Sequence, residues 1–319
     1  MKKGIKITLI ALAALLVLAV AALALALVLQ LDLKGLNPTK YVTNTYTVTD
    51  AFWSIDIELA ECGVRFEPAL DGQTSVICSE TEHITHSVEV VNDTLTIRRH
   101  DDRRWYEHFG LSSDKMYIVV YLASSDFESL RLSAKSGDLE ISDQFSFNDA
   151  ELHTSSGDIS FSADVAYDLS VEASSGDVYI GFCAPQSIRV ESSSGDITLD
   201  SVNSEANVQL SASSGDVTLN TIYCSNLSVD TSSGAVDCFG TVVYGDLLIE
   251  TGSGSVKLDY SDGDYMRIHT GSGSVSGILE ASKDFRVSSS SGKISVPPGG
   301  NGGICEIKTS SGSINIQQG

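Results

Sequence analysis

The tetrapeptide Ser155-Ser156-Gly157-Asp158 is the first complete copy of the motif S-S-G-D, and this motif decides the fold. Variants of it recur to the C-terminus, with their glycines 19 or 20 residues apart. A period in this range is typical of stacked repeats rather than of one globular core. The repeat glycines are Gly137, Gly157, Gly176, Gly195, Gly215, Gly234, Gly254, Gly273, Gly292 and Gly312.

Two positions of the repeat are aliphatic in all ten units. Five residues before the glycine stand Leu132, Leu152, Val171, Val190, Leu210, Val229, Ile249, Ile268, Val287 and Ile307. Two residues after it stand Leu139, Ile159, Val178, Ile197, Val217, Val236, Val256, Val275, Ile294 and Ile314. Polar residues alternate with them, as in short strands with one buried face. The pattern predicts an all-β fold in which residues 126–319 form a β-solenoid, a rod of roughly 50 Å with an aliphatic core.

The turn residues have a local structural explanation. We expect each glycine to adopt a positive φ without steric cost, while serine and aspartate hydrogen-bond nearby backbone. An alternative concerns five consecutive aspartates of the turn, since carboxylates in a row are the kind of ligand that Ca²⁺ uses. They are Asp138, Asp158, Asp177, Asp196 and Asp216.

Residues 7–29 form an uninterrupted apolar run without charge, long enough at about 1.5 Å per residue to cross a hydrocarbon layer of about 30 Å. Lys2, Lys3 and Lys6 precede it, so the positive-inside rule places the N-terminus in the cytoplasm and the remainder outside the cell. We therefore expect residues 1–30 to hold a single-pass transmembrane helix, an uncleaved signal anchor in the cell membrane, followed by a tether over residues 31–45. A cleaved signal peptide is the alternative, because the alanines supply A-x-A sites.

The acidic composition excludes some partners. Leaving out those three lysines takes the formal net charge from −22 to −25. Such a surface repels nucleic acid and anionic lipid, and it suits a soluble extracellular domain. The cysteines are even in number, but Cys238 and Cys305 fall on inward repeat positions, where a free cysteine acts as a small hydrophobe. We expect free thiols, with a Cys62–Cys78 disulfide as the alternative.

Residues 46–125 keep a β pattern without the period, so we expect them to form an irregular N-terminal cap on the first rung of the solenoid. Together with the S-G-D repeats, three segments resemble the bacterial "putative adhesin" family of β-strand-repeat proteins over residues 50–319. They are Trp53-Ser54-Ile55-Asp56-Ile57, Asn92–Ile97 and Tyr117–Leu122. The resemblance implies a β-solenoid, frequently membrane-tethered, whose molecular function is largely uncharacterised and which has no catalytic residues to carry over.

Two outward columns of the predicted sheet carry groups that bind metals. Four residues before successive glycines stand His153, Glu172 and Glu191, and further along the same column stand Asp230, Glu250 and His269. One imidazole with two carboxylates is a ligand set that suits Zn²⁺ or Mn²⁺. The alternative is a solvated row of charge, paired with arginines two positions away.

One basic and aromatic cluster stands out in the acidic domain. Arginines with Trp and Tyr are enriched at binding hot spots, so this cluster is a candidate surface for a cell-envelope protein or a wall polymer. The alternative is a solvated loop whose arginines pair with Asp101, Asp102 and Glu107. The candidate binding residues are Arg98, Arg99, Arg103, Arg104, Trp105 and Tyr106.

Little in the sequence indicates catalysis. Asp237 and Lys257 are neighbours on an outward column, but G-x-S-x-G, H-E-x-x-H and Walker motifs are lacking. We therefore expect a non-enzymatic, membrane-anchored extracytoplasmic scaffold or adhesin-like binding module without a cofactor. An envelope-sensing regulatory component that contacts a membrane partner, and an enzyme acting on cell-surface glycans, are the alternatives.

The C-terminal end predicts one more contact. The chain stops directly after the last turn, so Ile307, Ile314 and Ile316 should lie at an open sheet edge. An open edge can recruit another strand. We expect a weak homodimer through this C-terminal rung.

Overall fold

The computed structural model describes residues 40–104 and 116–319, of which residues 41–102 and 116–319 belong to one compact unit. The described part is all β, with 25 strands in one continuous network of pairings. Among these residues there is no helix long and apolar enough to span a membrane. The predicted anchor, residues 7–29, lies outside the described residues.

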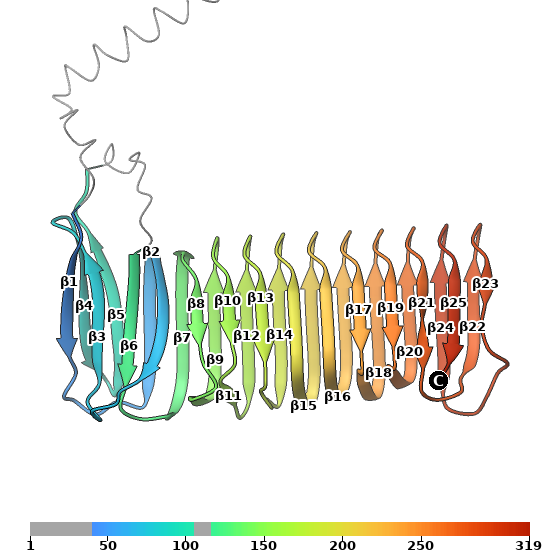
Figure 1. The fold of residues 1–319 in the computed structure, drawn as a ribbon, viewed down its shortest axis with the longest axis horizontal. Helices are drawn as coiled ribbons and strands as arrows, with labels where there is room; N and C mark the ends of the chain where they lie inside the picture. Colours follow the sequence, from blue (N-terminus) through green and yellow to red (C-terminus); the bar gives the residue numbers. More distant parts are fainter. Residues whose placement is uncertain (1–39, 105–115) are drawn as a thin grey trace, which may run out of the picture. The chain divides into compact units, whose positions relative to one another are not determined.

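The strands divide into a cap and a solenoid (Figure 1). The cap strands are β1 (Val42–Thr47), β2 (Ser54–Pro68), β3 (Ser75–Glu80), β4 (Ile84–Val91), β5 (Thr94–Asp101) and β6 (Met116–Leu122). The solenoid strands are β7 (Asp126–Ser136), β8 (Leu139–Ile141), β9 (Ser146–Thr154), β10 (Ile159–Phe161), β11 (Asp164–Val165), β12 (Asp168–Ala173), β13 (Val178–Gly181), β14 (Ser187–Ser192), β15 (Ile197–Ala212), β16 (Val217–Thr231), β17 (Val236–Phe239), β18 (Val242–Thr251), β19 (Val256–Asp259), β20 (Asp262–Thr270), β21 (Val275–Leu279), β22 (Asp284–Ser289), β23 (Ile294–Ser295), β24 (Ile304–Thr309) and β25 (Ile314–Gln318).

Parallel pairing between successive turns confirms the predicted β-solenoid. On one side of the S-S-G turn, Val171 pairs with Leu152 and with Val190. On the other side, Ile159 pairs with Leu139 and with Val178. The sequence columns are therefore physical columns, and 18 of their 20 aliphatic residues are buried. The two exceptions, Val287 and Ile294, belong to the same unit.

The unit of Gly292, which holds these two exceptions, lies at the end of the stack. The last two units stack in the reverse of their sequence order, so the Gly312 unit lies between the Gly273 and Gly292 units. Strand β24 lies between β20 and β22, and β25 lies between β21 and β23, as Figure 1 shows. The prediction that Ile307, Ile314 and Ile316 form an open edge is therefore wrong, since their exposed fractions are 0%, 0% and 3%.

A buried lysine holds the connection between β23 and β24, the segment that lets the last two units stack in reverse order. After β23 the chain returns through residues 296–303 before it enters β24. Lys283, 2% exposed, donates from Nζ to the carbonyl oxygens of Gly263 at 2.8 Å and Gly302 at 2.6 Å, and it forms an ion pair with Asp262. The lysine thus ties the returning segment to the rung below. The insertion leaves outermost the unit that carries Lys293 beside Ile294.

The repeat glycines are required by contact rather than by φ. Of the ten, only Gly137 has a positive φ, of 134°, so the expectation of positive φ throughout is wrong. The turns stack backbone on backbone: a Cβ built on Gly254 would lie 1.7 Å from the carbonyl oxygen of Gly234. No side chain fits in that space.

The cap is built on β2, a continuous strand that serves as the first rung. Its first half pairs in parallel with β5 and β7, and its second half with β6 and β8. Antiparallel β3 and β4 extend this arrangement, and β1 pairs with β3. Strand β1 starts at Val42, inside the segment expected to be a tether. Asn92 and Asp93, both at positive φ, form the tight hairpin turn between β4 and β5.

Candidate functional site

Arg98 and Arg99 are the two members of the predicted basic cluster that belong to the cap, and both form ion pairs. Arg98 pairs with Asp56 and donates to the Asp56 carbonyl oxygen at 2.7 Å. The side chain of Arg99 is 4% exposed, with Nη2 2.8 Å from Asp101 and 3.5 Å from Glu61. These side chains therefore stabilise the cap rather than form a free basic surface.

The remaining members of that cluster are Arg103, Arg104, Trp105 and Tyr106. Arg103 is half-buried and Arg104 is exposed, and both belong to a compact unit other than that of Arg98 and Arg99. Trp105 and Tyr106 lie outside the described residues. A binding role for these four residues stays a prediction.

The predicted metal columns align as the period requires. Glu172 pairs in register with His153 and with Glu191, and Glu250 pairs with Asp230 and with His269. His153 Nδ1 lies 3.3 Å from a Glu172 carboxylate oxygen, but Glu191 is engaged by Arg189. Within residues 40–104 and 116–319, neither trio brings three ligand atoms within 4.8 Å of one another. In this arrangement the columns are rows of charge, and cation binding there stays a prediction.

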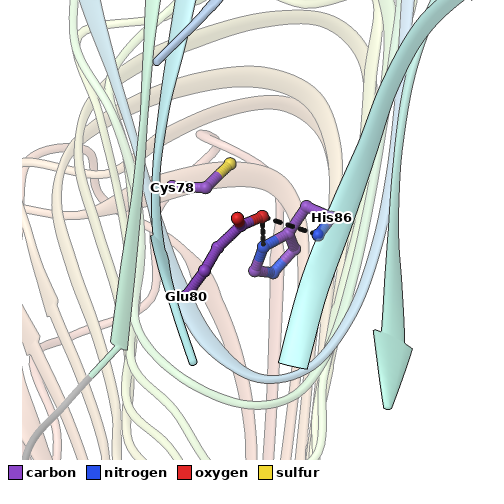
Figure 2. A group of neighbouring side chains, drawn as sticks. All are labelled: Cys78, Glu80 and His86. Carbon is purple, nitrogen blue, oxygen red and sulfur yellow. Dashed lines mark hydrogen bonds and ion pairs between the residues drawn. The ribbon is translucent and has the colours of Figure 1, made fainter. Parts of the chain in front are cut away.

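The group that does bring three such atoms within 4.8 Å lies in the cap: Cys78, Glu80 and His86, all buried. Cys78 and Glu80 come from β3, and His86 comes from β4 (Figure 2). The Glu80 carboxylate accepts hydrogen bonds from the His86 ring Nδ1 at 3.1 Å and from the His86 amide at 2.7 Å. Period-based sequence reasoning missed this cluster because the cap has no repeat that would align its polar residues.

The Glu80 carboxylate accepts four hydrogen bonds within the cap. Besides the two from His86, it accepts hydrogen bonds from Tyr46 Oη, at 3.0 Å, and from the Asn44 side chain, both on β1. Oε1 accepts three of these four hydrogen bonds, and Oε2 accepts the one from Asn44. The cluster therefore acts as a buried polar latch, which we call the Glu80 latch (Asn44, Tyr46, Glu80 and His86), and it holds β1 and β4 to β3.

Hydrogen bonds set the protonation state of Glu80, and burial sets that of His86. Burial raises the pKa of Glu80, but the hydrogen bonds from Asn44, Tyr46 and His86 outweigh it and leave that pKa below its usual value. Burial lowers the pKa of His86, even though Glu80 favours the charged ring. At neutral pH an ionised Glu80 thus accepts a hydrogen bond from a neutral His86. The second ring nitrogen of His86, Nε2, is buried and has no hydrogen-bond partner among the described residues.

All six cysteines are free and buried, so the alternative of a Cys62–Cys78 disulfide is not realised. Burial raises the pKa of Cys62 and of Cys78 to about 12. A thiol rather than a thiolate is the stable form there, and such cysteines are chemically inert.

The turn aspartates bind backbone of the next rung. Asp158 Oδ1 accepts a hydrogen bond from the Asp177 amide at 3.0 Å, and Asp177 Oδ1 accepts one from the Asp196 amide at 2.9 Å. The ladder runs on to Asp216, which accepts from the amide of Ala235 at 2.7 Å. These contacts confirm that the turn aspartates hydrogen-bond nearby backbone, and calcium binding by their row stays a prediction.

Exposed aromatic side chains gather on the opposite edge of the solenoid. They lie five to ten residues after their repeat glycine, at the lower edge in Figure 1, where β11 lies. We call this set the aromatic edge, with exposed fractions from 40% to 66%: Tyr167, Phe182, Tyr223, Phe239, Tyr244 and Tyr260. Sequence analysis missed it because the aromatic residues vary in position within the unit; their recurrence in the segment between the two strands was the available signal.

Two residues of the aromatic edge have strained backbone. Phe182 and Tyr260 have φ of 58° and 52°, at the corner position that Gly240 occupies in another rung. Ser201 and Thr221 have a φ of 56° at the same position of their rungs, so the left-handed corner belongs to the repeat, and a large side chain is strained there. The rings of Phe239 and Tyr260 also pack edge to face, with centroids 6.4 Å apart. The aromatic edge is the strongest candidate binding surface of the described residues.

Comparison with known proteins agrees with this architecture. The model of the family described as "Toastrack DUF4097" matches residues 52–237 and 186–318. The chain belongs to this family. The family resemblance seen in the sequence is thereby confirmed. No curated protein matches the sequence.

Solved structures similar to this family member are distant in sequence. A "putative lipid binding protein" from Parabacteroides distasonis is 15% identical, with a TM-score of 0.49, and the alignment covers 86% of this chain and 96% of that one. A "putative adhesin" from Bacteroides fragilis is 16% identical, with a TM-score of 0.38 and coverages of 88% and 98%.

Proposed function

We propose that this protein is a non-enzymatic binding module of the cell surface that holds a cell-envelope protein along its aromatic edge. The observation that carries the proposal is the gathering of six exposed aromatic side chains on one edge of the solenoid. Tyrosine and other aromatic residues are enriched at protein interfaces, because each ring supplies a large contact area at a low cost in conformational entropy.

The acidic net charge of the protein indicates which kind of partner surface it can bind. With a formal net charge of −22, the protein favours a neutral or basic contact surface and disfavours nucleic acid or an anionic polymer. Near the edge, Asp264 and Glu280 line a shallow concavity together with Tyr244. A partner that combines apolar groups with lysine or arginine complements both features.

The sheet faces give no support to catalysis. Lys257, the neighbour of Asp237 in register, forms an ion pair of 2.6 Å with Asp259. A general acid and base in a groove would need converging titratable groups with perturbed protonation. The binding proposal needs only the rigid, repeated surface that the solenoid provides.

Display outside the cell is the second half of the proposal, and it rests on Lys2, Lys3 and Lys6 before the apolar run 7–29. Protease added to intact cells should remove residues 41–319 and leave the anchor. Full protection of the chain would contradict this orientation.

Site-specific photo-crosslinking tests the binding surface. A photoreactive phenylalanine placed at Tyr244 or Tyr223 of the full chain should crosslink one envelope protein in cells. The matched control is Leu248, an outward residue on the sheet face of the same rung as Tyr244, where no such adduct should form. Equal adducts at Tyr244 and Leu248, or none at either aromatic position, would contradict the proposal.

Affinity for the crosslinked partner, once purified, gives a second readout. Replacing Tyr223, Phe239 and Tyr244 together by serine should weaken binding at least tenfold, since aromatic residues dominate interface hot spots. Replacing the outward sheet residues Asp230 and Glu250 by serine should leave the affinity within about twofold. Retained affinity after loss of the three rings would contradict the role of the aromatic edge.

A further inference from the structure

The far end of the solenoid is an unpaired rung. Among the residues that the structure describes, strand β22 is bonded to β24 alone and β23 to β25 alone. Its inward residues Phe285, Val287 and Val296 are half-buried, and Ile294 is 40% exposed, whereas the equivalent residues of the inner rungs are buried. This rung thus leaves both apolar surface and backbone groups without a neighbour.

Backbone geometry shows which groups of β22 are free. The Asp284 amide donates to the Gly303 carbonyl oxygen at 2.8 Å, so it faces β24. Because backbone groups alternate along a strand, those of Phe285, Val287 and Ser289 face away from the stack. The edge is covered just before this point, since the Lys283 carbonyl oxygen accepts a hydrogen bond of 2.8 Å from the Gly300 amide. The free edge therefore runs over residues 285–289.

A second copy of the same edge fits this strand under three constraints. Keeping both apolar faces on the core side of an antiparallel pair requires inward residues to lie opposite inward residues. The two-fold axis then lies midway between one residue and the same residue of the second copy. An axis at Phe285 would pair Val287 with Lys283, whose carbonyl oxygen is already bonded to Gly300. An axis at Arg286 would place the two Arg286 side chains, which carry like charges, directly opposite each other. An axis at Val287 uses the whole free edge, residues 285–289, without either conflict.

We propose that β22 pairs antiparallel with β22 of a second copy, centred on Val287, and so joins two solenoids end to end. Val287 exchanges two hydrogen bonds with its counterpart, and Phe285 pairs with Ser289 of the second copy. Residues 283–295 contain Lys283, Asp284, Arg286 and Lys293, so this end does not share the acidic excess that makes two copies repel elsewhere. The exchanged order of the last two units creates this edge, because it places β22 outermost.

A disulfide test reads out both the pairing and its register. In the proposed register Arg286 lies opposite Ser288 of the second copy in a non-hydrogen-bonded pair, where Cβ atoms are about 4.5–5.5 Å apart, within reach of a disulfide after small adjustment. All six native cysteines are buried, so an introduced outward cysteine is the reactive one. Full-length Arg286→Cys and Ser288→Cys chains, mixed in detergent under mild oxidation, should give the mixed disulfide at least tenfold faster than either chain alone gives its own.

The matched control uses an inner rung. Arg267 and His269 occupy the corresponding positions of β20, which is paired on both sides, and the mixture of Arg267→Cys with His269→Cys should not crosslink. Adding Val287→Pro to the first pair should abolish the mixed disulfide, because proline removes the outward amide while an edge strand tolerates it. A mixture that crosslinks no faster than the control, or one unaffected by Val287→Pro, would overturn the proposal.

Discussion

The amide of Ser313 donates a hydrogen bond of 3.2 Å to the hydroxyl of Ser274, 39 residues earlier in the chain. In the preceding rungs the same contact spans one unit, as between Ser274 and Ser255. The Thr309 hydroxyl also contacts the Gly273 unit directly, since it donates a hydrogen bond of 3.0 Å to the carbonyl oxygen of Gly273. The last unit is therefore laid directly on the Gly273 unit, and the unit that precedes it in sequence becomes the end of the rod.

The stacked turns predict a steep cost for any side chain at a repeat glycine. Gly254→Ala would place Cβ 1.7 Å from the Gly234 carbonyl oxygen, and separating the rungs should cost about 3 kcal/mol of unfolding free energy. Gly299→Ala, where the nearest atom lies 3.9 Å away, is the control. Denaturant unfolding should show a lower midpoint for Gly254→Ala alone; equal midpoints would contradict backbone-on-backbone stacking.

The inward columns predict an asymmetry between adjacent residues of β16. Val229 is 1% exposed, so Val229→Asp buries an unpaired carboxylate and should cost about 4 kcal/mol or more. Ser228, on the outward face, should tolerate aspartate within about 0.5 kcal/mol. Thermal unfolding of both variants measures the difference, and equal losses would mean that the register is wrong.

The left-handed backbone of Phe182 predicts that relieving its strain raises stability but weakens partner binding. Phe182 has a φ of 58°, and asparagine adopts this region more readily, so Phe182→Asn should raise the unfolding free energy by about 1 kcal/mol. The same change should weaken binding of the partner identified by crosslinking. A lower melting temperature would show that the ring serves packing rather than recognition.

The Glu80 latch predicts a loss of stability in acid. The pKa of His86 in the fold lies below its ordinary 6.5, so its contribution is full above pH 6.5 and is lost as pH falls through the folded value. The lowered pKa of Glu80 acts in the same direction below its ordinary 4.5. Melting temperature should therefore fall from pH 7 towards pH 4, with the drop just below pH 6.5 due to His86.

A histidine control separates the latch from general acid effects. His83 is exposed on the same cap, so His83→Gln should leave the pH profile unchanged, whereas His86→Gln should flatten it between pH 6.5 and pH 5. A profile that is flat in the unaltered protein, or one that His86→Gln leaves untouched, would contradict the proposed protonation states.

The sequence predicted the solenoid because a period of 19 or 20 residues constrains every unit alike. Val171, Val190 and their equivalents repeat one environment ten times, so their inward position follows from counting alone. The same counting could not predict the exchange of the last two units, because both present aliphatic residues at the same positions. That choice depends on the crossover held by Lys283, a contact between segments that periodicity does not encode.

The candidate sites were predicted less well, for a related reason. The His153 column was placed in the right register, but convergence of ligands depends on side-chain geometry, and Glu191 turns to Arg189 instead. The Glu80 latch joins residues of β1, β3 and β4, whose antiparallel pairing has no repeat to reveal it. The aromatic edge stayed hidden because Phe182 and Tyr223 occupy different positions in their units.

Hydrogen exchange measured on a dilute sample of the full chain tests the exchanged order most directly, since amide protection reports which strands are paired on both sides. Peptides from residues 304–318 should be as protected as those from residues 256–279, while peptides from residues 284–295 should exchange faster although they precede them in the chain. Faster exchange at 304–318 than at 284–295 would show units stacked in sequence order and would contradict the account.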